Sequence, residues 1–146
     1  MFTNKGFDLM KTESIGAIKF GLTAKQVIEL IGEPDEIEEP FNSEVDGETY
    51  QHFYYKSKGV FLSFIFKSDS IKEVRLIEIK APCSLKTSRK IGIGSAESEV
   101  MNAYKEYINN ELSDSSEIVA GSFYGGIVFS IENHKVKSIY IGATAD

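Results

Sequence analysis

The sequence has very little of the chemistry that holds metal ions or covalent cross-links in proteins. Cys83 is the only cysteine among 146 residues, so no disulfide can form within the chain and no site of several cysteines can exist. The only histidines, His52 and His134, lack the H-x-H or H-x-x-x-H spacing that is typical of a histidine metal site. We therefore expect no metal site, and no motif in the sequence calls for a cofactor.

Long apolar segments are also missing. The most apolar run, Val60–Phe66, has seven residues and is interrupted by Ser63, whereas a membrane-spanning helix needs about 20 apolar residues. The first ten residues include Lys5 and Asp8 and contain no apolar run of the length found in signal peptides. Together with the single cysteine, these features favour a reducing compartment, and we expect a cytoplasmic protein.

Basic residues are few, and their distribution is uneven. The chain has 22 Asp and Glu against 16 Lys and Arg, a net charge of −6, and this balance disfavours general binding to nucleic acid. Between Gln26 and Tyr55 there is no Lys or Arg, whereas the same stretch holds nine acidic residues. In the rest of the chain the 16 basic residues outnumber 13 acidic ones. The acidity is therefore concentrated in one stretch, which lacks the residue spacing of a calcium loop.

No strong catalytic signature is present. The run from Ile91 to Ser95 contains two glycines, but it lacks the third glycine of a dinucleotide-binding loop and the Lys-Ser/Thr pair of a P-loop. Cys83 could act as a nucleophile only beside a base, so we interpret it as a small buried hydrophobic residue. His52 falls in an expected strand and His134 in an expected turn, where structural or solvated roles are the simpler interpretation.

The chain contains two similar halves. The matched blocks are residues 18–28 with 91–101, 59–64 with 126–131, and 71–76 with 136–141. Three matched blocks in the same order predict a duplication. We expect a single domain, residues 1–146, built of two repeats at about 10–80 and 85–146, with residues 81–84 as the joint.

Each predicted repeat begins with a short helix. In the first, Thr23 and Gln26 form a capping-box pattern, and the Gly-x-Pro sequence that starts at Gly32 ends the helix. In the second, Ser95 is the expected N-cap. Because no Gly-x-Pro stop follows, we expect this helix to continue to about Asn110.

Three strands are predicted after each helix, from runs of aromatic and β-branched residues. These strands cover residues 50–56, 59–66 and 71–79 in the first repeat and 117–124, 126–132 and 135–142 in the second. The turns between them are short, as at Asn133-His134, so successive strands must pair antiparallel. The predicted fold class is α+β, with the helices packed on one face of a shared antiparallel sheet.

The first predicted helix also matches a known pattern. The sequence G-x-T-x-x-x-V-x-x-x-I-G-x-P over residues 21–34 resembles the helix-start signature of the bacterial small outer-membrane lipoprotein assembly factors, whose tandem relatives are the β-lactamase inhibitor protein-like domains. The second half keeps Gly94 and Val100 but loses the Gly-x-Pro stop, and the disulfides of the secreted inhibitors cannot form with Cys83 alone. The resemblance implies two helix-plus-meander copies that share one sheet and bind another protein through the exposed sheet face and loops.

One predicted strand combines aromatic residues with the acidic stretch. With a period of two, Phe53 and Tyr55 point to one face of the strand, and Tyr50 and Tyr54 point to the other. Tyrosines on a solvent-facing sheet are typical of interface anchors, and they are equally typical of residues that simply cover a sheet. The acidic stretch is either a solvated loop or a surface that attracts a basic partner. The expected partner-binding residues are Glu36, Glu38, Glu39, Phe41, Glu44, Asp46, Glu48, Tyr50, His52 and Tyr54.

The leading hypothesis is a non-enzymatic protein-binding module, of the inhibitor or immunity type, from a bacterium. It would neutralise a basic toxin domain, such as a nuclease, and would bind neither nucleic acid nor membrane. One alternative is a small-ligand binder or an enzyme with a site between the two repeats, which would use His52, Glu48 and Tyr54. A further alternative is a structural protein of envelope assembly. The sequence leaves the partner's identity and the oligomeric state open.

Overall fold

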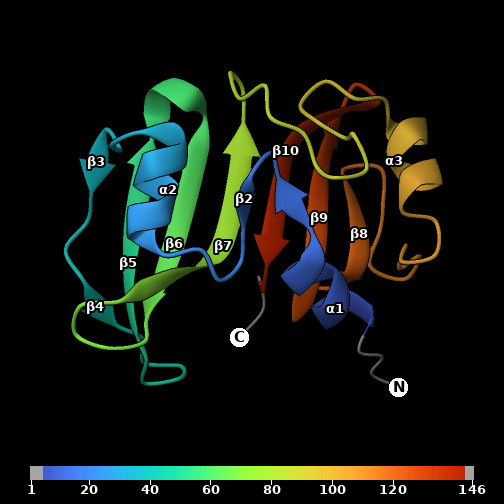
Figure 1. Cartoon of the computed structure of the whole chain (residues 1–146). Coiled ribbons are helices and arrows are strands. Elements are labelled where there is room, and N and C mark those ends of the chain that lie inside the picture. Colours follow the sequence, from blue (N-terminus) through green and yellow to red (C-terminus); the bar gives the residue numbers. More distant parts are fainter. Residues whose placement is uncertain (1–4, 144–146) are drawn as a thin grey trace.

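A computed structural model describes residues 5–143 of the chain and confirms the predicted α+β class (Figure 1). Its main sheet is antiparallel, and its strands lie in the order β3-β5-β6-β7-β10-β9-β8, with β4 also paired to β5. Helices α1, α2 and α3, the α-helices of the described residues, lie on one face of this sheet (Figure 1). We call the opposite face of the sheet, which the helices leave uncovered, the open face. The last three residues of the second predicted repeat, 144–146, lie outside the described residues.

Each half of the chain contributes a three-strand meander. The first consists of β5 (Thr49–Tyr55), β6 (Val60–Phe66) and β7 (Lys72–Lys80), and the second of β8 (Glu117–Ser122), β9 (Gly125–Glu132) and β10 (Lys135–Gly142). Short edge strands β3 (Glu36–Ile37) and β4 (Phe41–Asn42) extend the first meander, and the 3-10 turn η1 (Lys56–Lys58) joins β5 to β6. The meanders meet where β7 pairs with β10, in a register that places Ile79 opposite Ile139. One continuous sheet therefore spans both halves.

Helix α2 (Ala24–Ile31) forms as its sequence predicts. The Thr23 hydroxyl accepts a hydrogen bond from the Gln26 backbone N–H, and the Gln26 side chain accepts one from the Thr23 N–H. These bonds satisfy two of the donors that a helix N-terminus leaves unpaired. At the other end, Gly32 adopts a φ of 90°, and its carbonyl accepts a hydrogen bond from the Tyr55 hydroxyl. The C-terminus of α2 is thus tied to the sheet beneath it.

Helix α3 (Glu97–Ala103) differs from the prediction at both ends. Its N-cap is Ala96, because the Ser95 hydroxyl instead accepts a hydrogen bond from the Gly92 N–H. It ends well before Asn110, since the backbone of residues 107–109 hydrogen-bonds to the outer edge of β8. Pairing with a sheet edge has therefore replaced the last turns of the expected helix.

The segments that lead into α2 and α3 make the same backbone contacts. Each segment contains a glycine with a φ near 90°, Gly21 in the first half and Gly94 in the second, a conformation that favours glycine. The matched hydrogen bonds are Gly21 N–H to Val74 O (3.2 Å) and Val74 N–H to Leu22 O (2.8 Å), and Gly94 N–H to Val136 O and Val136 N–H to Ser95 O (both 2.8 Å). The two halves therefore share a local scaffold, and their origin by duplication stays a prediction.

The N-terminal segment is a part of the fold that the sequence did not reveal. Helix α1 (Lys5–Thr12) packs against β8 and β9, and a small hairpin of β1 (Ser14–Ile15) and β2 (Ile18–Lys19) follows it. Gly6 lies so close to the backbone of Gly125 that a Cβ at this position would be 2.3 Å from the Gly125 oxygen. A glycine close to a helix start is a poor helix signal, but here it permits the close approach of α1 to β9.

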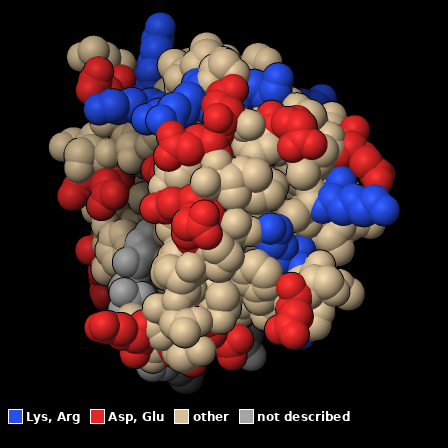
Figure 2. All heavy atoms as spheres, turned by 90° about the vertical axis from the view of Figure 1, so that its left-hand side faces the viewer, with Lys and Arg blue, Asp and Glu red and all other residues tan. Residues whose placement is uncertain are grey.

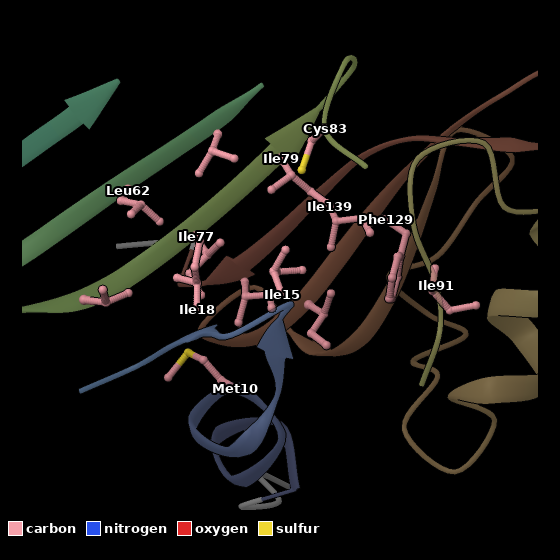
Figure 3. Close-up of a cluster of buried hydrophobic side chains, with 14 of the residues drawn as sticks. Met10, Ile15, Ile18, Leu62, Ile77, Ile79, Cys83, Ile91, Phe129 and Ile139 are labelled. Atoms are coloured by element: carbon pink, nitrogen blue, oxygen red, sulfur yellow. The ribbon is translucent and has the colours of Figure 1, made fainter. Parts of the chain in front are cut away.

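The hydrophobic core fills the space between the helices and the sheet. In Figure 3, side chains of the N-terminal segment, such as Ile15 and Ile18, lie against Ile77 of β7 and Ile139 of β10, all of them with no exposed surface. Buried residues of both halves belong to one cluster. Cys83 is among them, which confirms its interpretation as a small buried residue, and burial raises the pKa of its thiol.

Candidate protein-binding surface

Strand β5 separates its side chains between the core and the open face, as the period of two predicts. Phe53 and Tyr55 are 2% and 1% exposed and belong to the core, whereas Tyr50, His52 and Tyr54 point to the other side and are only partly buried. Because one face of this strand meets the helix side, the alternate residues are left at the open face. The fold therefore places the expected aromatic residues on a solvent-facing sheet.

These side chains form a continuous cluster with two neighbours from adjoining strands. We call the five rings of Phe41, Tyr50, His52, Tyr54 and Phe61 the aromatic cluster. The ring centroids are 4.9 Å apart for Phe41–His52 and for His52–Phe61, 5.1 Å for Tyr54–Phe61 and 6.2 Å for Phe41–Tyr50. Phe61 was not predicted as a site residue, and only its register opposite Tyr54 on β6 reveals its place.

The Glu38 carboxylate holds two members of the cluster in place. One of its oxygens lies 2.7 Å from His52 Nδ1 and accepts a hydrogen bond of 2.9 Å from the Tyr54 hydroxyl. The hydrogen bond from Tyr54, followed by that from His52, lowers the pKa of Glu38. The carboxylate is thus ionised at neutral pH and is fixed against the aromatic cluster.

A second carboxylate holds the other end of the cluster. Asp46 accepts a hydrogen bond of 2.5 Å from the Tyr50 hydroxyl and one of 2.8 Å from the Glu48 backbone N–H. The bond from Tyr50 lowers the pKa of Asp46, while burial and then the bond to Asp46 raise the pKa of Tyr50 to about 12. The Tyr50 hydroxyl is therefore protonated across the physiological pH range, and it can donate its hydrogen bond to Asp46 throughout that range.

The remaining expected acidic residues divide into two groups. Glu36 forms an ion pair of 2.8 Å with Lys56, whose amino group also lies 5.9 Å from the centre of the Tyr54 ring. The side chains of Glu39, Glu44 and Glu48 are exposed to solvent. The structure thus gives seven of the ten expected residues a side-chain interaction, and it leaves the side chains of Glu39, Glu44 and Glu48 exposed on the surrounding loops.

The acidic stretch does not form one unbroken negative surface. Figure 2 looks at the edge of the molecule that carries β3 and β4, and it shows acidic side chains in separate groups with neutral surface between them. Lys and Arg side chains lie along the upper border and on the right of this view. The surface is therefore mixed, with negative groups placed around uncharged and aromatic side chains.

A pocket of about 610 Å³ adjoins the aromatic cluster. Tyr54, Phe61 and Glu78 line it, together with Lys56 and Lys80. Glu78 is half-buried, and burial raises the pKa of its carboxyl. The pocket belongs to the first meander, so it does not coincide with the expected small-ligand site between the repeats.

The structure does not bring together His52, Glu48 and Tyr54, the three residues expected to form an enzyme or small-ligand site. The carboxylate that joins His52 and Tyr54 belongs to Glu38 and not to Glu48. The His52 ring packs edge-on against Phe41 and Phe61, an arrangement that holds the imidazole as part of a packed surface. Within residues 5–143, no group of three or more His, Cys, Asp or Glu side chains is placed to hold a metal ion. No helix in the same range is long and apolar enough to cross a membrane.

The chain matches no protein-family model, no curated protein and no solved structure. The resemblance to the β-lactamase inhibitor protein-like domains therefore stays a prediction. Function must be inferred from the chemistry of the aromatic cluster and of the two carboxylates that hold it.

Proposed function

We propose that the protein is a non-enzymatic protein-binding module that uses the aromatic cluster to bind a basic partner. The observation that carries this proposal is the group of five partly exposed rings on the open face, held by the carboxylates of Glu38 and Asp46. Tyrosine and other aromatic side chains provide much of the binding free energy at protein interfaces, because they bury a large area with few rotatable bonds.

The hydrogen bonds within the cluster support a binding role. Tyr50, His52 and Tyr54 are each bonded to a carboxylate in the free protein. Side chains that are already ordered lose less conformational entropy when a partner binds. A preorganised surface of this kind is suited to tight recognition without rearrangement.

The charge of the surface indicates the class of partner. Nine acidic residues lie between Gln26 and Tyr55, and the carboxylates of Glu39, Glu44 and Glu48 are exposed around the aromatic cluster. Such a surface attracts a positively charged protein and speeds its association. The partner that fits best is the basic domain of a toxin, such as a nuclease, which this protein would neutralise in the cytoplasm as an immunity-type inhibitor.

Co-expression with the products of neighbouring genes tests this proposal. A basic partner should co-purify with the wild-type chain, and raising the salt concentration should weaken the complex because exposed charges are screened. The matched comparison uses Tyr54→Ala/Phe61→Ala in the aromatic cluster and Ser130→Ala/Ser138→Ala on the open face of the second meander. Loss of the partner with the first pair alone is the expected result. Recovery of no protein, or equal recovery with both pairs, would reject the proposal.

A second candidate function is the binding of a small ligand in the pocket beside Tyr54. The half-buried Glu78 carboxyl, next to the Phe61 ring, favours this possibility. A ligand that occupies a preformed pocket raises the free energy of unfolding. A thermal-shift screen should then find compounds whose stabilising effect disappears in Glu78→Gln, and a screen without such compounds would exclude this function.

A further inference from the structure

The amino group of Lys72 lies in an unusual setting on the helix side of the sheet. Lys72 is the first residue of β7, and its Nζ donates a hydrogen bond to the side-chain oxygen of Gln51. The same nitrogen lies 5.2 Å from the centre of the Phe53 ring and 5.4 Å from that of Phe66. Among the described residues, Lys72 makes no salt bridge with a carboxylate. Its surroundings are therefore aromatic rings and a neutral amide.

Lys72 lies at the wall of a groove that runs beside helix α2. The groove has a volume of about 720 Å³, and apolar side chains, including Ile28, Ile37 and Ile71, line much of it. Ile37 and Ile71 are each about half exposed. The groove is a concave, largely apolar site whose lining also includes a few charged side chains, and Lys72 is one of its two lysines. Apolar walls with a few polar groups are the usual composition of a small-molecule site.

The carboxylates that line the groove form no salt bridge with this amine within the described residues. The other charged side chains that line it are Lys25 and Glu29 of α2 and Glu33, which follows the end of α2, while β5 contributes Gln51 and Phe53 beside the amine. Burial lowers the pKa of Lys72, whereas the ion pair with Glu36 raises the pKa of Lys56. The neutral, nucleophilic form of the amine is therefore more accessible at Lys72 than at an exposed lysine.

We propose that Lys72 and the α2 groove form a site for an apolar aldehyde or ketone, held as an imine. The lone pair of the neutral amine attacks the carbonyl carbon, and a C–N bond forms as the C=O π bond breaks. Proton transfer from nitrogen to oxygen gives a carbinolamine, which loses one water molecule to form the C=N bond. No redox partner is needed, and partly buried lysines carry this chemistry in enzymes. The site lies on the opposite face of the sheet from the aromatic cluster, so it is independent of the proposed function.

Reductive trapping on the full chain tests this site with benzaldehyde as the probe. The wild-type protein is mixed with benzaldehyde near neutral pH, the imine is reduced with borohydride, and the benzylated lysines are located by peptide mass spectrometry. We expect Lys72 to be modified at least tenfold more than Lys25, which lines the same groove. Lys72→Arg should remove this adduct, while Lys25→Arg should leave it unchanged. Modification of Lys72 equal to or below that of Lys25 would overturn the inference, and this comparison needs only the wild-type chain.

A competition experiment separates a binding site from a merely reactive amine. Benzyl alcohol has the shape of the probe but no carbonyl group, so it should occupy the groove without reacting. We expect it to slow the modification of Lys72 and to leave that of Lys137, an exposed lysine on β10, unchanged. Equal modification of Lys72 with and without benzyl alcohol would show that the groove does not hold the probe, and it would reject the proposed site.

Discussion

The two meanders have the same framework on their helix side and different chemistry on the open face. On the helix side, Leu62 of the first meander and Phe129 of the second occupy matching positions, and both are fully buried. On the open face, Tyr54 pairs with Phe61 in the first meander. The pair at the matching place in the second meander is Val119 with Val128.

This difference shows which side chains of the sheet the fold requires and at which positions the side chains can differ between the two meanders. The side chains under the helices must fill one shared core in both halves, so they remain apolar and well packed. On the open face the first meander presents partly exposed rings and carboxylates, whereas the second has the buried Val119 and Val128, the partly buried Tyr140 and small residues such as Ser130 and Ser138. We therefore expect changes under the helices to affect stability in both halves, and changes on the open face to affect binding in the first half alone.

The largest effects on stability should come from the shared core. Leu62→Ala and Phe129→Ala each remove a fully buried side chain, and we expect losses of roughly 2–5 and 3–5 kcal/mol in the free energy of unfolding. Urea unfolding monitored by circular dichroism measures both. A loss below about 1 kcal/mol at either position would show that this half does not contribute to a common core.

The helix starts offer a matched pair of smaller effects. Thr23 and Ala96 are the N-caps of α2 and α3, with similar extended backbone angles, but only Thr23 has a hydroxyl that can accept a hydrogen bond. Thr23→Ala should lower the free energy of unfolding by about 1 kcal/mol, and Ala96→Thr should raise it by up to a similar amount. The same unfolding measurement on both variants tests this.

Two results would contradict the expectation that the N-caps at Thr23 and Ala96 are comparable. If Thr23→Ala had no effect, the capping bond to Gln26 would not stabilise α2. If Ala96→Thr were destabilising, the two helix starts would not be equivalent despite their matched backbone contacts.

The smallest effect is a dependence of stability on pH that belongs mainly to the first half. Hydrogen bonds lower the pKa values of Asp35, Glu38 and Asp46 in the folded protein. Each group therefore contributes stability above its unfolded pKa, and this contribution is lost as pH falls through the folded pKa. The loss should begin below about pH 5 and continue below about pH 4.

Neutral variants test the assignment of this pH dependence. In Asp35→Asn/Glu38→Gln/Asp46→Asn, the free energy of unfolding should change less between pH 7 and pH 3 than in the wild type. In Asp114→Asn, which removes a single carboxylate of lowered pKa from the second half, the change should stay closer to the wild type. If the free energy of unfolding depended on pH identically in the wild type and the triple variant, these three carboxylates would not cause the pH dependence.

The elements that the sequence predicted are those governed by local signals. The capping box of Thr23 and Gln26, the helix end at Gly32 and the alternation along β5 each depend on neighbours within a few residues, and the structure confirms them. The turn at Asn133 and His134, both with positive φ, is another local signal that holds.

The parts that the sequence missed depend on contacts between distant segments. Helix α3 stops at Ala103 because residues 107–109 pair with β8, and α1 is stabilised by packing on β8 and β9. The same holds in the candidate site, where Glu38 meets His52 and Tyr54 across 14 and 16 positions of the chain. The composition of residues 26–55 predicted an acidic surface. Only the register of the strands shows that Glu38, and not Glu48, binds His52 and Tyr54.

The binding surface is tested most sharply by the affinity of the purified partner for three forms of the protein, measured by isothermal titration calorimetry. The forms are the wild type, Tyr54→Ala/Phe61→Ala in the first meander, and Ser130→Ala/Ser138→Ala in the second. We expect the first pair to weaken binding by about 30-fold or more, because interface anchors are lost, and the second pair to leave the Kd within about twofold. Equal weakening by both pairs, or no weakening by either, would contradict the claim that the open face of the first meander is the binding surface.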